Sequence, residues 1–153
     1  MNFFEKGQRA IKTMFGFGAY LAKSPIEKPL LNLVYFRVSQ INGCAYCLDM
    51  HSKDLRAEGE SEQRLYMISA WREASCYSDR ERAALAFAEA VTRVGQTQHV
   101  PDAVYAEVRS QFSEEELVDL TIAVLAINSW NRINVAFQTP AGDYQPGQFA
   151  VHA

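Results

Sequence analysis

The sequence lacks most of the features that would place the protein in a membrane or on a nucleic acid. No apolar run approaches the roughly 18–20 residues that a helix needs to cross a bilayer. Lys and Arg number 15 against 18 Asp and Glu, which gives a net charge of −3. The basic residues are scattered among acids, whereas phosphate binding needs a clustered basic surface. We therefore expect neither a membrane nor a nucleic acid as a partner.

Cysteine is also scarce, with three residues in 153. An odd number, in a chain with no recognisable secretory signal, is typical of a reducing compartment rather than of a disulfide framework. The segment 3–23 carries four basic side chains but a single Arg and no Ser, so it fits a first packed helix better than a transit peptide. We expect a cytoplasmic protein.

The composition that is present is ordinary for a globular protein. The chain is 48% hydrophobic and 22% charged, and it is long enough to bury one core. Apolar residues recur at helical spacing almost throughout, and no segment alternates convincingly like a strand. Capping boxes at Ser78–Glu81 and Ser113–Glu116 predict two helix starts. We predict an all-α bundle of about six to seven helices in a single domain over residues 1–138.

The last stretch, residues 139–153, differs from the rest. It contains two prolines and two glycines and has no helical period. We predict an irregular C-terminal tail or arm. Its Tyr144, Phe149 and Val151 would either pack on a neighbouring subunit or belong to a frayed terminus.

Most of the chemical information lies in the CxxC pair Cys44 and Cys47 and in His51. The dipeptide 42–43, Asn-Gly, predicts a turn, so Cys44 should begin a helix that Gly59 ends. On that helix Cys47 and His51 lie one turn apart, and Cys44 and His51 differ in direction by only about 20°. A dithiol beside an imidazole at a helix start is typical of redox-active cysteines, because the thiolate is the nucleophile.

Other uses of this motif compete with thiol chemistry. A metal site would need a fourth ligand from Cys76 or His99, but no second ligand pair follows at regular spacing, so we expect no metal. A c-type haem needs His directly after the second cysteine, where Leu48 stands. A buried pair of structural thiols with a hydrogen-bonded histidine stays open, although three such residues on one helix face favour the redox interpretation.

Several segments of the chain match one family. The central match is Arg37–Asp54, which reads RVSQINGCAYCLDMHSKD. It is accompanied by residues 64–66 (RLY), 70–73 (AWRE), 81–85 (ERAAL) and 126–132 (AINSWNR). These segments resemble the AhpD-like alkylhydroperoxidases of the carboxymuconolactone decarboxylase superfamily, and the resemblance covers roughly residues 25–137.

The resemblance implies an all-helical homo-oligomer, built from trimers, dimers or a hexamer, that needs no cofactor beyond its redox-active disulfide. It implies that Cys47 attacks a peroxide, that Cys44 resolves the sulfenic acid into a disulfide, and that His51 accepts or relays the proton. The partners would be a small hydroperoxide and a thiol or protein reductant.

Some positions depart from the family or lack an assigned role. The family's proton relay commonly includes a Glu twelve residues before the first cysteine, where this chain has Asn32. Asn cannot accept a proton near neutral pH. Asp54 is therefore a candidate substitute, and Asn32→Glu should raise peroxidase activity. The resemblance also places Asn131 or Arg132 beside the dithiol, where they line the pocket or hydrogen-bond between helices or subunits.

The resemblance leaves more than one function open. The same scaffold would serve a disulfide reductase or electron carrier for another peroxidase, or a non-catalytic oligomer whose dithiol senses redox state. Lactone decarboxylation, the activity of the superfamily's namesake, does not need a CxxC pair. The presence of the CxxC pair in this chain therefore favours a thiol-dependent peroxidase.

Overall fold

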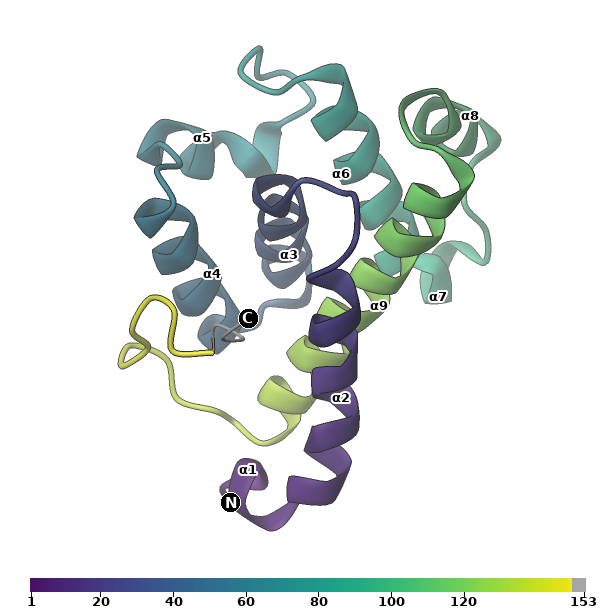
Figure 1. Ribbon diagram of the computed structural model, residues 1–153. Helices are drawn as coiled ribbons and strands as arrows, with labels where there is room; N and C mark the ends of the chain where they lie inside the picture. The colour runs from purple at the N-terminus through teal and green to yellow at the C-terminus, as the bar shows by residue number, and fades with distance from the viewer. Residues whose placement is uncertain (150–153) are drawn as a thin grey trace.

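Residues 1–149 are described by the computed structural model, and they form nine α-helices and one 3-10 turn without a β-strand (Figure 1). The predicted all-α class is confirmed. The elements in chain order are α1 (Phe3–Lys6), α2 (Gln8–Leu21), α3 (Lys28–Asn42), α4 (Ala45–Ala57), α5 (Glu62–Met67), η1 (Ile68–Ala70), α6 (Asp79–Thr92), α7 (Val94–Thr97), α8 (Asp102–Gln111) and α9 (Glu114–Ala136).

The described part of the chain has more helices than the six to seven predicted, because several are very short. α1 and α7 are single turns of four residues, and η1 tightens the end of α5. After η1 the backbone leaves the helix, and Arg82 of α6 donates hydrogen bonds to the backbone carbonyl groups of this segment. Its guanidinium donates to the carbonyls of Trp71, Arg72 and Ala74 at 2.9, 2.5 and 2.9 Å.

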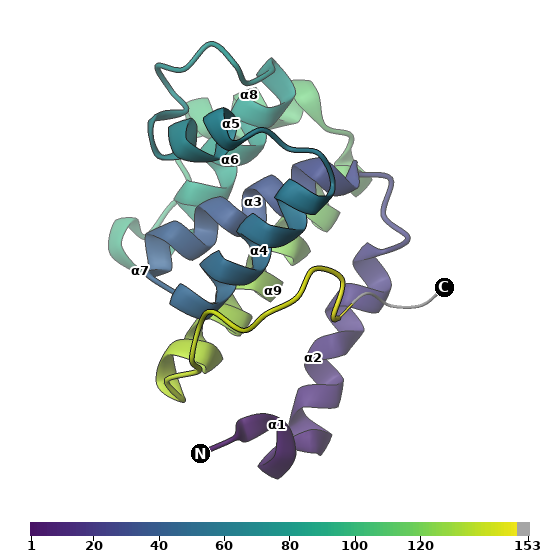
Figure 2. The ribbon, with the colours of Figure 1, turned by 90° about the vertical axis from the view of Figure 1, so that its left-hand side faces the viewer.

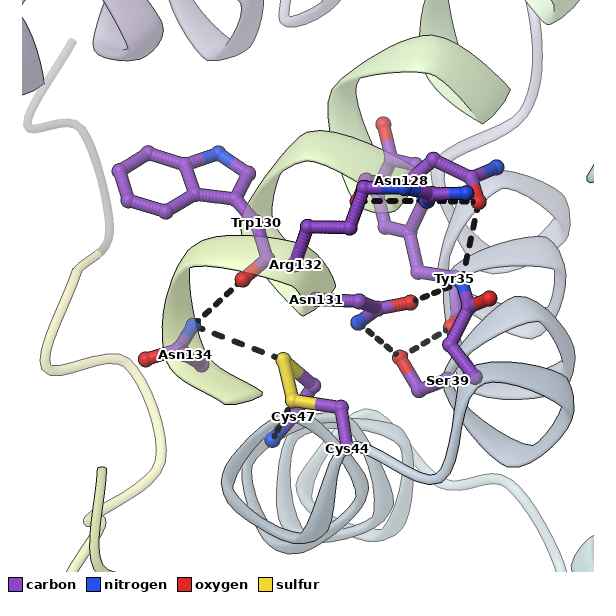
Figure 3. The surroundings of a disulfide bond; sticks show 10 residues. Tyr35, Ser39, Cys44, Cys47, Asn128, Trp130, Asn131, Arg132 and Asn134 are labelled. Atoms are coloured by element: carbon purple, nitrogen blue, oxygen red, sulfur yellow. Dashed lines mark hydrogen bonds between the residues drawn. A yellow bond between two sulfur atoms is a disulfide. The ribbon is translucent and has the colours of Figure 1, made fainter. Parts of the chain in front are cut away.

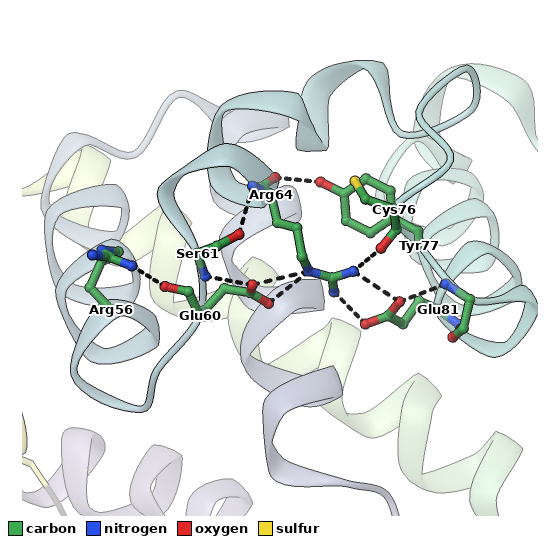
Figure 4. Close-up of polar contacts among 8 residues, drawn as sticks. Arg56, Glu60, Ser61, Arg64, Cys76, Tyr77 and Glu81 are labelled. Carbon is green, nitrogen blue, oxygen red and sulfur yellow. Dashed lines mark hydrogen bonds and ion pairs between the residues drawn. The ribbon is translucent and has the colours of Figure 1, made fainter.

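A second arginine, Arg64 of α5, holds the same loop (Figure 4). It pairs with Glu60 and Glu81, with N–O distances of 3.0 and 2.5 Å. It also donates to the Cys76 carbonyl and lies 4.7 Å from the centre of the Tyr77 ring. The Cys76 thiol is exposed and outside any disulfide. This loop therefore has a structural arrangement of its own, remote from the CxxC pair.

The centre of the bundle is α3, which packs against α4, α6 and α9 (Figures 1 and 2). Val34 and Val38 of α3 are fully buried in one hydrophobic cluster with Leu120 and Val124 of α9. Leu33 belongs to a second cluster on the side of α4 and α5. Each fully buried aliphatic side chain of this size contributes about 1.5–3 kcal/mol. α3 and α9 are thus firm supports for α4, which carries the CxxC pair.

Helix starts and ends follow the predicted local signals. α3 ends at Gly43, whose φ of +64° lies in the left-handed region that glycine adopts freely. α4 begins at Ala45, so Cys44 is its N-cap residue rather than its first helical residue. The capping boxes at Ser78–Glu81 and Ser113–Glu116 are confirmed as the starts of α6 and α9.

The segment after α9, residues 137–149, runs along α4 (Figure 2). Lys53 of α4 donates to the carbonyls of Gly142 and Tyr144 at 2.8 and 3.0 Å. Asp49 accepts the Gly142 N–H at 3.0 Å, and Asp54 accepts the Tyr144 hydroxyl at 2.9 Å. The segment is therefore fastened to α4 by polar contacts along one helix face.

These contacts bear on the predicted packing of the arm. Tyr144 is 4% exposed and packs within its own chain, and Phe149 stacks near it with ring centres 6.0 Å apart. Val151 lies outside the described residues. The polar anchors on α4 are not revealed by the helical pattern of the sequence, and contact of the arm with a neighbouring subunit stays a prediction.

α1 and α2 extend from the body of the bundle (Figures 1 and 2). α2 packs against α9 and buries Ile11 and Leu21. Tyr20 and Ser24 donate their hydroxyls to the buried Asp119 of α9 at 2.7 and 2.6 Å. Within residues 1–149, none of the helices combines the length and the apolarity needed to span a bilayer. The homo-oligomer stays a prediction.

Candidate active site

Cys44 and Cys47 form a disulfide across the first turn of α4 (Figure 3). Their Cα atoms lie 5.4 Å apart, within the range that a disulfide spans without backbone movement. Cys44 Sγ accepts the Cys47 N–H at 3.3 Å as the cap of the helix. Both cysteines are buried, with 1% and 0% of their surface exposed. The backbone thus holds the two sulfurs where a disulfide can open and close without rearranging the helix.

His51 lies one turn after Cys47 and is also buried. Its Nε2 atom has no hydrogen-bond partner among residues 1–149. Burial lowers the pKa of His51 to about 4, because the imidazolium form would lose its hydration. The ring lies 5.5 Å from that of Tyr35, whose pKa burial raises. Near neutral pH His51 is therefore an uncharged imidazole that can accept a proton.

Asn134 of α9 is the third polar side chain at the disulfide (Figure 3). Its Nδ2 donates to Cys47 Sγ at 3.6 Å and to the Trp130 carbonyl at 2.9 Å. Its Oδ1 is buried without a hydrogen-bond partner in the described part of the chain. Sequence reasoning assigned Asn134 no role. The available signal was its spacing, because it follows Ile127 and Trp130 on the face of α9 that lines the site.

Cys47, His51 and Asn134 meet in the lining of a cavity of about 470 Å³. The cavity lies between α2, α3, α4 and α9, and Phe149 of the C-terminal segment closes part of it. Small-molecule sites typically have volumes of about 300–1,000 Å³. Cys44 lies outside the lining. Of the two cysteines, Cys47 is therefore the one that a small molecule in this cavity would lie against.

The residues predicted for a proton relay lie elsewhere. Asn32 donates to Glu58 at 2.7 Å, and Glu58 also pairs with Lys28 at 2.5 Å. Glu58 follows the end of α4, two turns beyond His51. Asp54 holds the C-terminal segment through Tyr144. Within the described residues, His51 Nε2 has no carboxylate at hydrogen-bond distance.

Asn131 and Arg132, for which the sequence left pocket lining and interhelical hydrogen bonding open, are not among the residues that line this cavity. Asn131 is fully buried; it donates to Ser39 at 3.0 Å and accepts from Asn42 at 2.9 Å (Figure 3). Arg132 is exposed and donates to Asn128 on its own helix at 2.7 Å. Asn131 thus forms hydrogen bonds between helices, which is the other role that the sequence left open for it. It ties α9 to the end of α3 and so fixes the turn that leads into α4.

The two side chains considered as a fourth metal ligand are both exposed. Cys76 lies in the loop before α6, and the Nδ1 atom of His99 lies 2.8 Å from the Thr97 carbonyl. Residues 1–149 contain no group of three or more His, Cys, Asp or Glu side chains placed to hold a metal ion.

Comparisons with known proteins show the family and the fold. The model of the carboxymuconolactone decarboxylase family matches residues 8–90. The chain is 42% identical to the uncharacterised protein YdfG of Bacillus subtilis over 136 residues, which is 89% of this chain and 92% of YdfG. It is similar to a crystal structure from Agrobacterium tumefaciens of a protein of unknown function, described as a candidate antioxidant defence protein AhpD. That match has a TM-score of 0.89 at 39% identity and covers 94% of this chain and 98% of the other. The debrominase Bmp8 shares the fold, with a TM-score of 0.78 at 20% identity over 92% of this chain and 75% of Bmp8.

Proposed function

This chain belongs to the carboxymuconolactone decarboxylase family, and from its site we propose that it is a thiol-dependent peroxidase of the AhpD-like kind. The family predicted from the CxxC segment is confirmed. The observation that carries the proposal is the position of Cys47. Cys47 lines an apolar cavity together with His51 and the amide donor Asn134, and Cys44 lies within disulfide reach.

The proposed reaction balances over two thiols. The Cys47 thiolate attacks the terminal oxygen of a hydroperoxide, so an S–O bond forms, the O–O bond breaks and an alcohol leaves. The Cys44 thiol then attacks the sulfenic sulfur of Cys47, forms the disulfide and releases water. A thiol reductant returns the disulfide to two thiols and becomes oxidised itself. One hydroperoxide and two reductant thiols thus give one alcohol, one water and one new disulfide.

His51 and Asn134 have complementary roles in this scheme. His51 is neutral near neutral pH, so it accepts the thiol proton of Cys47 and returns it to the leaving alkoxide. The same proton is removed and given back, which is why the first step works without a carboxylate behind His51. Asn134 donates its N–H to the sulfur and stabilises the thiolate by a charge-assisted hydrogen bond.

Single cysteine variants test the proposal. Reduced wild-type protein mixed with cumene hydroperoxide in a stopped-flow instrument should lose two thiols per chain to the disulfide. Cys44→Ser should stop at a sulfenic acid on Cys47, detected by dimedone labelling, whereas Cys47→Ser should react no faster than a free thiol. Cys76→Ser is the matched control, because Cys76 is exposed and outside the cavity lining, and it should react like the wild type. A sulfenic acid that forms on Cys44 in the Cys47→Ser variant would reverse the assignment.

The same experiment separates the other activities predicted from the sequence. A disulfide carrier would react slowly with peroxide and rapidly with a partner disulfide, and a redox sensor would oxidise once without turning over. The near-complete burial of both cysteines argues against direct exchange with a large protein disulfide. We therefore favour the peroxidase.

A further inference from the structure

The cavity beside Cys47 carries no fixed charge in the part of the chain that the structure describes. Seventeen residues line it, and none of them is Asp, Glu, Lys or Arg. Seven of the seventeen are Phe, Tyr or Trp. A charged group without a partner in such surroundings loses its hydration and gains nothing in return. The lining therefore disfavours carboxylate-bearing and ammonium-bearing ligands.

Four aromatic rings from distant parts of the chain follow one another along this cavity. Phe149 and Phe4 have ring centres 6.2 Å apart, Phe4 and Trp130 6.4 Å, and Trp130 and Phe15 5.4 Å. These separations are those of ordinary aromatic contacts. All four rings belong to the lining, so a flat apolar group can pack against them.

The polar atoms that need a partner lie at the Cys47 end. His51 Nε2 and Asn134 Oδ1 are the buried side-chain nitrogen and oxygen atoms without a hydrogen bond among the described residues. Both residues line the cavity. A neutral imidazole nitrogen and an amide oxygen can each accept a hydrogen bond. Because buried polar atoms are normally paired, these two select a ligand with a hydroxyl-type donor.

We infer that the cavity binds an uncharged ligand with an aromatic body and one hydroxyl or hydroperoxyl group, the polar group lying at Cys47, His51 and Asn134. This inference rests on the proposed function when the ligand is a substrate. The substrate class is then an uncharged aryl-alkyl hydroperoxide. Hydrogen peroxide leaves the aromatic walls unused, and a hydroperoxide with a carboxylate must bury a charge.

Binding is tested on the oxidised protein, in which Cys44 and Cys47 cannot react. The probe is cumyl alcohol, the product expected from cumene hydroperoxide, measured by isothermal titration calorimetry. Tert-butanol removes the aromatic body, and atrolactate replaces one methyl of cumyl alcohol with a carboxylate. Cumyl alcohol should bind at one saturable site, and each comparison ligand should bind at least about tenfold more weakly. Equal affinities, or no binding of cumyl alcohol to the folded protein, would overturn the inference.

A pair of charge variants on α2 makes the test specific. Met14 lines the cavity, whereas the neighbouring Thr13 is exposed and does not. Met14→Lys supplies a cation to the lining, so it should strengthen atrolactate binding and weaken cumyl alcohol binding, each by at least about tenfold. Thr13→Lys adds the same charge outside the cavity and should leave both affinities unchanged. The same change in both variants would overturn the inference, because it would place the ligand elsewhere.

The outcomes also separate this inference from the proposed function. If cumyl alcohol binds but reduced protein fails to consume cumene hydroperoxide, the peroxidase proposal fails and the ligand class stands. If the protein reduces hydrogen peroxide and cumene hydroperoxide with equal kcat/KM and binds no cumyl alcohol, the peroxidase stands and the ligand class fails.

Discussion

Asn134 provides the most direct test of how the fold prepares the nucleophile. In the disulfide form, Asn134 Nδ2 lies 3.6 Å from Cys47 Sγ. In the reduced protein the same Nδ2 would donate a hydrogen bond to the Cys47 thiolate. Hydrogen bonds to charged groups contribute about 1.5–3 kcal/mol. The distance is long, so we take about 1.4 kcal/mol, which corresponds to about one pH unit or a tenfold change in thiolate population.

The perturbation is Asn134→Leu, which keeps a similar shape and removes the donor. It is made together with Cys44→Ser and Cys76→Ser, so that Cys47 is the remaining thiol of the three cysteines. The midpoint of the pH profile of iodoacetamide alkylation should rise by about one unit, and the rate at pH 7 should fall about tenfold. Asn134→Asp should raise the midpoint further, because a carboxylate repels the thiolate.

Asn131→Leu is the matched control, because Asn131 is a buried amide on the same helix that contacts Ser39 and Asn42 instead of the disulfide. It should lower the melting temperature and leave the alkylation midpoint unchanged. If Asn134→Leu changes the melting temperature but not the midpoint, Asn134 is only a packing residue. The reasoning about the thiolate is then refuted.

Three further predictions follow from the other contacts of α4. Asp54→Ala removes the acceptor of the Tyr144 hydroxyl, so amide hydrogen exchange in the C-terminal segment should accelerate about tenfold or more, measured by mass spectrometry. Asn32→Glu should not raise peroxidase activity, contrary to the sequence-based prediction, because position 32 faces Glu58 instead of His51; a higher steady-state rate would restore the relay account. The pKa of His51 falls from about 6.5 unfolded to about 4 folded, so the unfolded state binds its proton first as pH decreases and stability drops in that window. Between pH 7 and pH 4.5, the free energy of unfolding measured with denaturant should fall by about 2 kcal/mol more in the wild type than in His51→Gln. An equal fall in both proteins would contradict this account.

Much of the fold could be read from local signals in the sequence. The two capping boxes and the glycine at position 43 act within a single turn, so their outcome depends on a few neighbouring residues. The placement of Cys47 and His51 on one face of α4 follows from helix geometry in the same way. The disulfide between Cys44 and Cys47, which the structure shows, was implied by the family resemblance.

The residues that depend on packing between helices could not be read in this way. α9 is apolar around most of its circumference, so the sequence does not show which side faces the site, and it singled out Asn131 rather than Asn134. The structure turns Asn131 toward α3 and Asn134 toward Cys47. Tyr144 and Asp54 are ninety positions apart, and no periodicity relates an irregular segment to a distant helix.

The state of His51 also predicts which half of the catalytic cycle limits turnover. Oxidation by peroxide returns the thiol proton to the leaving alkoxide, so a neutral His51 suffices for it. In the reduction the reductant thiolate attacks the disulfide, and the proton that the reductant thiol has lost ends on the leaving cysteine sulfur. With a pKa of about 4, His51 holds no proton of its own near pH 7, so the reductant must supply the proton at a disulfide that is buried and hard to reach.

We therefore expect a rapid oxidation of one equivalent of hydroperoxide, followed by slow turnover limited by the thiol reductant. Stopped-flow mixing with excess cumene hydroperoxide should show the burst. The steady-state rate should then increase linearly with dithiothreitol and stay constant as the hydroperoxide concentration doubles. His51→Gln should slow the burst and leave the reductant-limited rate nearly unchanged, since access of the reductant to the buried disulfide limits that step. A steady-state rate that follows the hydroperoxide concentration instead would show that oxidation is the slow half and that His51 is a poorer base in the first step than its position beside Cys47 implies.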